Sequence, residues 1–227
     1  MTVKAFTFGL FQTNTYVVSV GERIFLIDPA CSSEYERQTL QNYIESLSAE
    51  RSFSEQSERS LLFQRSGLTI VATHGHLDHL WGAKWATEHW HTPVLMHDAD
   101  IPMAQAMQDQ YDLFGIPWKA ESFPVESLTA EGGPSAQRSL LFQRSGLSIV
   151  STPGHTPGSV CLYWPEEKTL LSGDTLFCMG FGRTDLPGGN YGQLIQSLNT
   201  LFALPSDVIV YPGHGESTTI GAENRAY

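Results

Sequence analysis

The most informative stretch of this chain is Thr73-His74-Gly75-His76-Leu77-Asp78-His79, which offers three imidazoles and one carboxylate within six residues. Helical spacing would not aim all four of these side chains inward, so the sequence predicts a tight loop. A loop so crowded with ligands is costly unless a metal ion fills it. Imidazole is a borderline donor and carboxylate a hard one, a set that suits zinc, with iron or manganese as alternatives.

Three shorter motifs carry further ligands: Pro153-Gly154-His155, Ser172-Gly173-Asp174-Thr175 and Pro212-Gly213-His214-Gly215. Together with the first stretch they give seven candidate metal ligands, namely His74, His76, Asp78, His79, His155, Asp174 and His214. This order of ligands predicts a site for two metal ions. Two plainer interpretations are a set of hydrogen-bonded histidines without metal and a metalloprotein that has lost catalysis.

An apolar run precedes each ligand cluster, at residues 68–72, 147–150, 169–171 and 208–211. Each run predicts a β-strand that ends at its cluster. If the strands lie side by side, their ends bring the four segments together at one rim of a sheet, where loops can carry chemistry on a rigid base.

The remaining patterns predict an α/β layered domain. Residues 15–20 and 23–27 are expected to form a hairpin, and residues 34–47, 80–90, 99–113 and 193–204 to form helices. Polar stretches at 48–60 and 127–136 are expected to be exposed loops. Ten residues at 59–68 recur unchanged at 138–147, which predicts two equivalent hairpins in two similar halves of the fold. This identity has no functional explanation.

The composition narrows the class of protein. The 227 residues, of which 41% are hydrophobic, are expected to form one domain over residues 1–227. A formal net charge of −11 would repel phosphate backbones, so nucleic acid is not an expected partner. No segment reaches the roughly 18 apolar residues of a membrane helix, and no leader peptide is recognisable, so a cytoplasmic protein without membrane contact is expected.

With these motifs laid out, the chain resembles the metallo-β-lactamase superfamily, whose fold is a four-layer αββα sandwich with metals at one edge of its sheets. Within that superfamily it is most similar to the short, single-domain glyoxalase II-like (hydroxyacylglutathione hydrolase-like) members, through the four motifs above and through Gly182-Arg183-Thr184-Asp185. That tetrapeptide is shared with the persulfide dioxygenases, a branch with a single iron.

The resemblance implies a division of the ligands. His74, His76 and His155 would hold one metal, Asp78, His79 and His214 the second, and Asp174 would bridge the two, so that Asp78 and Asp174 are the expected catalytic carboxylates. A hydroxide between the metals would attack the carbonyl of a small thioester or ester, such as a hydroxyacyl-glutathione. The alternative is an Fe(II) sulfur dioxygenase that uses His74, His155 and Asp174.

Several residues near the motifs keep two interpretations. Arg183 is expected to attract an anionic part of the substrate, although it could instead pair with Asp185 and lock its loop. Asp28 could orient a metal ligand or merely cap a turn before Pro29. Cys178 could be a reactive thiol near the metal, but it is expected to be a small buried apolar residue. A further set could form an apolar lid over the site or pack in the ordinary way: Met103, Met107, Tyr111, Phe114 and Trp118.

Overall fold

The computed structural model describes residues 1–52, 67–128 and 142–225. Within them the first sheet has six strands in the order β1 (Thr2–Phe8), β2 (Thr13–Val20), β3 (Arg23–Ile27), β4 (Leu68–Val71), β5 (Val94–Met96) and β6 (Val125–Ser127). The second has five, in the order β13 (Thr218–Thr219), β12 (Ile209–Pro212), β9 (Thr169–Gly173), β8 (Val160–Trp164) and β7 (Ser148–Ser151). A short antiparallel pair, β10 (Leu176–Phe177) and β11 (Gly180–Phe181), lies beside the second sheet.

The two sheets pack face to face because their strands are apolar on both sides. In β3, Ile24 and Leu26 belong to the core under the outer helices, whereas Phe25 and Ile27 belong to the core between the sheets. This is the alternation that a strand buried on both faces requires. The second sheet contributes Trp164 to the same central core, and its ring lies edge-on to Phe25 at 5.8 Å between centroids.

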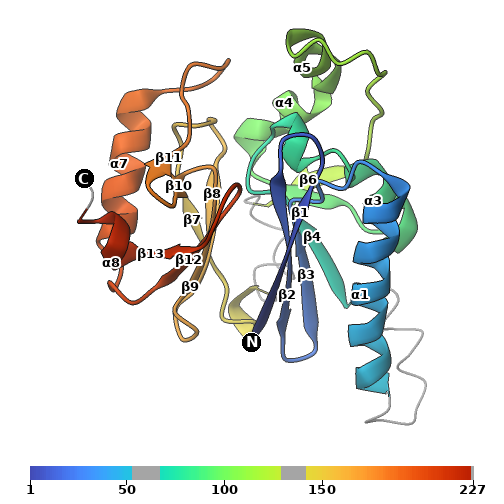
Figure 1. Cartoon of the computed structure of the whole chain (residues 1–227), viewed down its shortest axis with the longest axis horizontal. Helices are drawn as coiled ribbons and strands as arrows, with labels where there is room; N and C mark the ends of the chain where they lie inside the picture. The colour runs from blue at the N-terminus through green and yellow to red at the C-terminus, as the bar shows by residue number, and fades with distance from the viewer. Residues whose placement is uncertain (53–66, 129–141, 226–227) are drawn as a thin grey trace.

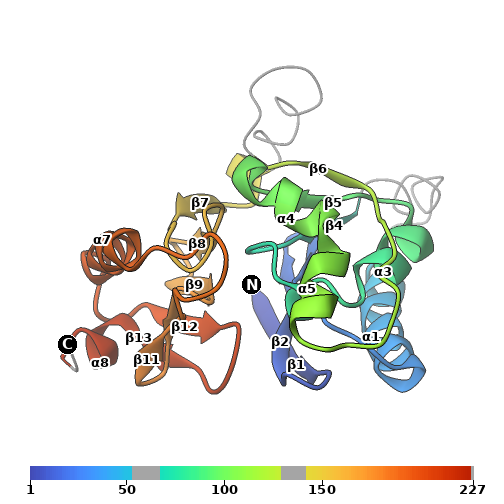
Figure 2. The same cartoon turned by 90° about the horizontal axis from the view of Figure 1, so that it is seen from above.

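Helices cover both outer faces, which gives the predicted four-layer αββα sandwich (Figures 1 and 2). Helices α1 (Glu34–Ser52) and α3 (Ala83–Trp90) cover the first sheet through the cluster that contains Leu40 and Ala86. Helix α7 (Tyr191–Phe202) covers the second through Leu194, Leu198 and Leu201. The last helix of the described residues is the short α8 (Ile220–Glu223). No helix in the described ranges is long and apolar enough to cross a membrane.

Several predicted elements are confirmed, and others differ for identifiable reasons. The hairpin at 15–20 and 23–27 is formed by β2 and β3, but β1 was not predicted. The expected loop at 48–60 is wrong over its first five residues, because α1 continues to Ser52; the rest of it lies outside the described residues.

The helix predicted at 99–113 is divided into a 3₁₀ turn, η2 (Asp98–Asp100), and two helices, α4 (Ile101–Gln105) and α5 (Met107–Leu113). At the break, Gln110 Nε2 donates to the backbone carbonyl of Met103 at 3.1 Å. In a continuous helix this carbonyl would accept from the backbone N–H of Met107. A side chain thus replaces the backbone donor, and the apolar periodicity of the sequence does not indicate such a replacement.

The duplicated segment does not form a hairpin where it can be described. Residues 59–66 of the first copy lie outside the described residues. In the second copy, residues 142–144 form a helical turn, and the backbone N–H of Leu147 donates to the carbonyl of Phe142 at 3.0 Å. The ring of Phe142 packs on Phe25 in the central core.

Hydrogen bonds join the two sheets at one edge. Asn14 on β2 donates its backbone N–H to Gly213 and its side-chain amide to Pro212 and Gly215, at 2.7, 3.0 and 2.9 Å. The hydroxyl of Tyr16 donates to the same Pro212 carbonyl at 2.7 Å. The loop that follows β12 is therefore fixed against the first sheet.

Candidate metal centre

The seven candidate ligands come together at the edge where the two sheets meet. The first cluster follows β4 of the first sheet, and its last residues form a 3₁₀ turn, η1 (Leu77–His79). The other three clusters follow β7, β9 and β12 of the second sheet. The prediction of one rim of one sheet was therefore wrong, because the supporting strands are divided between two sheets that face each other.

The ligand atoms form three overlapping groups in which all atoms lie within 4.8 Å of one another: His74 with His76 and His155, His74 with His79 and Asp174, and Asp78 with His79 and His214. His76 Nδ1 and His155 Nε2 are 2.8 Å apart. His214 Nε2 lies 3.2 Å from Asp78 Oδ2. The first and third groups are the two sets that the sequence resemblance implies.

Asp174 lies between those two sets. Its Oδ1 is 3.3 Å from His79 Nε2, and its Oδ2 is 3.5 Å from both His155 Nε2 and His214 Nε2. One carboxylate thus faces ligands of both sets, as a bridging carboxylate must. Gly213 leaves room for it, because a Cβ at this position would lie 2.1 Å from Asp174 Oδ1.

Hydrogen bonds on the outside of the centre fix the imidazoles. His155 Nδ1 bonds the backbone carbonyl of Arg183 at 2.7 Å, and His214 Nδ1 bonds that of Phe11 at 3.1 Å. Each ring therefore turns Nε2 into the site, the arrangement usual for metal-binding histidines. His76 is reversed and turns Nδ1 into the site.

Asp28 orients His79 rather than only capping a turn. Its Oδ2 accepts from His79 Nδ1 at 2.9 Å and from the Thr73 hydroxyl at 2.7 Å, and its Oδ1 accepts from the Thr73 backbone N–H at 2.7 Å. Asp28 has a φ of 51°, a left-handed conformation that is uncommon for a residue other than glycine. The three hydrogen bonds offset this strain, which is held next to the site.

Unpartnered buried atoms show that this cluster suits a cation. His74 Nε2, His79 Nε2 and Asp174 Oδ1 are buried and have no hydrogen-bond partner among the described residues, although the last two lie 3.3 Å apart as an ion pair. A buried polar atom without a partner costs about 1–3 kcal/mol, and here three of them point into one space. Nitrogen and oxygen donors in this number fit a divalent metal pair.

The electrostatics separate the two halves of the centre. Burial lowers the pKa of His74 well below its ordinary value, and burial together with His155 lowers that of His76 to about 3. Burial also acts to lower the pKa of His79 and His214, but the carboxylates around them prevail, so that of His79 is well above its ordinary value and that of His214 is about 9.

The carboxylates respond in the opposite direction. Burial acts to raise the pKa of Asp78, but His79 and His214 lower it to about 2, and His79 and His214 likewise hold the pKa of Asp174 well below its ordinary value. Both carboxylates are therefore ionised at neutral pH. A metal entering the half around Asp78 would displace protons from His79 and His214.

Two other predictions concern the β10–β11 turn and the loop that follows β11. The Arg183 guanidinium is exposed and forms a bidentate pair with Asp185, at 2.6 and 2.7 Å, so the loop-locking contact exists. Cys178 is exposed, and the prediction of a buried residue was wrong because the short β10–β11 turn carries it outward.

A cavity of about 430 Å³ opens beside His76. Its lining is mainly apolar and comes from α4, α5 and the loop after Asp185, including Met103, Phe114 and Leu186. Of the five residues proposed as a lid, Met103 and Phe114 line this cavity, whereas Met107, Tyr111 and Trp118 line a different one.

No pattern in the sequence indicates two residues that support the ligand loop. Asp100 is fully buried and accepts hydrogen bonds from the backbone of Gly75 and Gly158, at 2.8 and 2.6 Å, and from the Thr156 hydroxyl. Gln110 accepts from the Leu77 backbone N–H at 2.9 Å. These contacts cross between distant segments, so no local spacing could indicate them.

Comparisons with known proteins agree with this geometry. A family model described as the metallo-beta-lactamase superfamily matches residues 8–214. The hydroxyacylglutathione hydrolase GloC of Haemophilus influenzae is 35% identical over 159 residues, which cover 69% of this chain and 73% of that protein. The probable metallo-hydrolase YqgX of Bacillus subtilis is 31% identical over 218 residues, covering 95% and 90%. A crystal structure of TTHA1623 in a di-iron-bound form superposes with a TM-score of 0.74 at 32% identity, covering 99% and 98% of the two chains.

Proposed function

The chain belongs to the metallo-β-lactamase superfamily, whose members are mostly metal-dependent hydrolases, and we propose that it hydrolyses a small thioester or ester at a centre of two divalent metals. The observation that carries the proposal is the meeting of seven donor side chains in two sets, with Asp174 between them. A hydroxyacyl-glutathione type of thioester is the substrate that we propose, since a relative named for that activity shares 35% identity.

The residues divide into roles as follows. His74, His76 and His155 would hold the first metal, Asp78, His79 and His214 the second, and Asp174 would contact both. Divalent metals bound there supply a Lewis acid that polarises a carbonyl and lowers the pKa of water toward about 7. Zinc suits this donor set, as does iron or manganese.

Hydrogen bonds within the chain would keep this centre in one geometry. Asp28, Phe11 and Arg183 hold three imidazoles from outside, through a carboxylate and two backbone carbonyls. The Thr13 hydroxyl donates to Asp78 Oδ2 at 2.8 Å, which fixes the carboxylate that faces His214. Ligands fixed in advance need no reorganisation when substrate binds.

The apolar cavity beside His76 would take the acyl part of the substrate. Among its lining residues, all of them described, there is one carboxylate, Asp109, and no Lys or Arg. The anionic part of a thioester would therefore lie elsewhere, and we place it near Arg183. The Arg183–Asp185 pair is exposed to solvent, where ion pairs add little stability, so the guanidinium can turn to a substrate anion at low cost.

The geometry also bears on the alternative of a single-iron sulfur dioxygenase. Such an enzyme would need His74, His155 and Asp174, but the second set of Asp78, His79 and His214 is equally complete. This completeness favours two metals.

The test is hydrolysis of S-lactoylglutathione and simple S-acyl thioesters by metal-loaded protein. Hydrolysis is monitored as the loss of thioester absorbance. We expect turnover that falls at least a thousandfold in His155→Ala. His89→Ala, which removes an imidazole on α3 outside the centre, is the matched control and should retain activity. One bound iron with O₂ uptake on a persulfide, and no thioester hydrolysis, would reject the proposal.

A further inference from the structure

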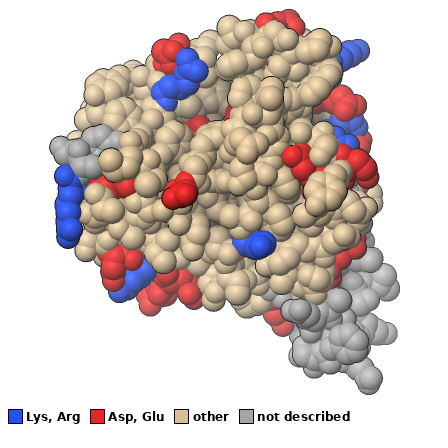
Figure 3. All heavy atoms as spheres, in the orientation of Figure 1, with Lys and Arg blue, Asp and Glu red and all other residues tan. Residues whose placement is uncertain are grey.

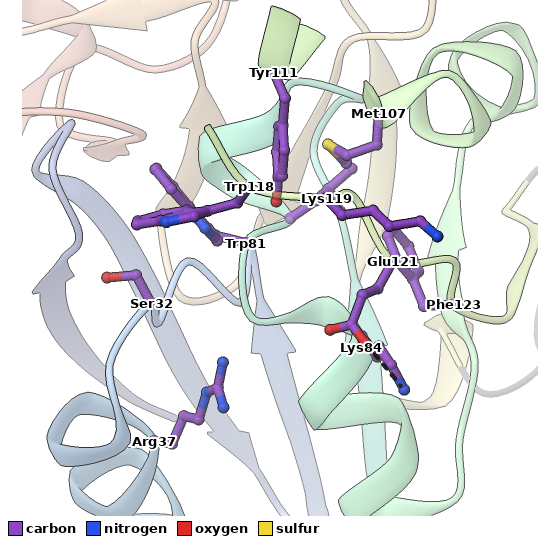
Figure 4. Close-up of a pocket in the computed structure, with 11 residues that line it drawn as sticks. Ser32, Arg37, Trp81, Lys84, Met107, Tyr111, Trp118, Lys119, Glu121 and Phe123 are labelled. Atoms are coloured by element: carbon purple, nitrogen blue, oxygen red, sulfur yellow. Dashed lines mark ion pairs between the residues drawn. The ribbon is translucent and has the colours of Figure 1, made fainter. Parts of the chain in front are cut away.

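A second cavity, of about 250 Å³, lies between α1, α3 and α5 and is drawn in Figure 4. Its lining contains none of the seven candidate ligands. The residues that line it are Ser32, Arg37, Leu80, Trp81, Lys84, Met107, Tyr111, Trp118, Lys119, Glu121 and Phe123. Helix α5 separates it from the cavity beside His76, because Met107 and Tyr111 face one space and Gln110 and Leu113 the other.

The cavity concentrates positive charge in an acidic protein. Three of the chain's 13 Lys and Arg residues line it, together with a single carboxylate, although the net charge of the chain is −11. On the face shown in Figure 3, by contrast, basic side chains lie apart from one another. Lys84 is neutralised by Glu88 and by Glu121, the latter at 4.0 Å.

Of the cations that line the cavity, neither Arg37 nor the exposed Lys119 forms an ion pair with a described residue. Arg37 is the one whose nitrogen is buried: its Nε has no hydrogen-bond partner among the described residues. Figure 4 shows the side chain extending from α1 toward Ser32, Trp81 and Trp118. A guanidinium that is partly removed from water and unpaired is ready for a planar, bidentate anion such as a carboxylate.

Aromatic rings form the neighbouring wall. Trp81 and Trp118 meet edge to face at 5.4 Å between centroids, and Trp81 lies 6.3 Å from Tyr111. Trp118 is 56% exposed, which is high for a tryptophan beside a cavity and leaves part of its ring free for contact. An engineered cavity of about 150 Å³ holds benzene, so the volume here suffices for a ring with one substituent.

We propose that this cavity is a second binding site, separate from the metal centre, for a small aromatic carboxylate. The ring would lie against Trp81, Trp118 and Tyr111, and the carboxylate would bind the Arg37 guanidinium. The proposal does not depend on the proposed function, since it uses none of the candidate metal ligands.

Benzoate is the probe, titrated into the metal-loaded full chain while tryptophan fluorescence and the heat of binding are recorded. We expect quenching with a Kd of about 1 mM or tighter, and at least tenfold weaker binding of benzyl alcohol, benzylamine and acetate. Arg37→Met should weaken benzoate binding at least tenfold, or about 1.4 kcal/mol. Trp118→Phe should remove much of the quenching while benzoate still binds.

Lys168→Met is the charge-matched control, since it removes a cation that pairs with Asp207 on the surface, away from the cavity. It should bind benzoate as the wild type does. Equal binding of benzoate by wild type and Arg37→Met would overturn the proposal. If such binding disappears when the metals are chelated, benzoate is a ligand of the metal centre instead.

Discussion

Replacing Asp28 by Asn tests the role of the hydrogen bonds around the metal centre. The substitution keeps the shape of the side chain but exchanges one acceptor oxygen for an NH₂ group. Asp28 Oδ1 accepts from the Thr73 backbone, and Oδ2 accepts from His79 Nδ1. In one orientation the amide NH₂ would face the His79 N–H, and in the other it would face the Thr73 N–H. Either way one buried donor loses its acceptor.

The magnitude follows from these contacts. An unpaired buried donor costs about 1–3 kcal/mol, so the free energy of unfolding should fall by that amount. Loss of the partner that orients a ligating imidazole usually weakens metal binding by about 10- to 100-fold. His79 belongs to the second set, so the binding free energy of one of the two metals should become less favourable by about 1.4–2.8 kcal/mol. Binding of the other metal should be unchanged.

The assay is a zinc titration of chelator-treated protein against a competing indicator, with thermal unfolding of the same samples. Asp100→Asn is the matched control, because Asp100 is equally buried and accepts three hydrogen bonds but contacts no imidazole. It should lose comparable stability with a smaller change in zinc affinity. Two undisturbed zinc sites in Asp28→Asn would refute the reasoning.

Three further predictions concern single positions. Gly213→Ala should lose at least one equivalent of metal, because its Cβ would lie 2.1 Å from Asp174 Oδ1. Gly192→Ala, whose Cβ would have its nearest neighbour at 3.4 Å, should keep its metal. The measurement is metal content after gel filtration, and equal content in the two variants would contradict the crowding argument. Burial acts to raise the pKa of Glu36, but backbone N–H groups that donate to its carboxylate lower the pKa below the ordinary value of 4.5. The negative charge therefore stabilises the fold at pH values above 4.5, and this stabilisation is lost as pH falls through the lowered pKa. Glu36→Gln should therefore unfold at a lower temperature than the wild type at pH 7, and the gap should close as pH falls through the lowered pKa of Glu36; a constant gap would show that the charge is not the cause. Arg183→Ala should raise KM for an anionic thioester more than it lowers kcat, and an unchanged KM would reject substrate contact.

The candidate ligands could be recognised in the sequence because each is part of a short motif after a strand. His74, His76, Asp78 and His79 share one loop, and the structure brings that loop to the other three clusters. Local spacing was sufficient to predict these ligands, since a loop with so many imidazole and carboxylate donors has few roles other than metal binding. The layered fold was predicted for a similar reason, because apolar strands such as β3 and amphipathic helices such as α7 are visible in the chain.

The parts that were missed depend on contacts between distant segments. Asp100 reaches Gly158 across 58 positions, and Gln110 replaces a backbone donor at Met103. The strands that precede the ligand clusters are divided between two sheets, and this division also depends on tertiary contacts. β4 and β12 have similar apolar patterns but pair with different neighbouring strands. Arg37 was not singled out either, because an arginine in an amphipathic helix usually lies in solvent.

The most direct test of the central claim is the metal content of the purified chain, measured by mass spectrometry alongside protein concentration. Two equivalents of divalent metal per chain are expected, falling to about one when Asp78 is replaced by Ala. A wild-type chain that takes up no metal, or only one equivalent when metal is in excess, would contradict a centre built by both sets of ligands.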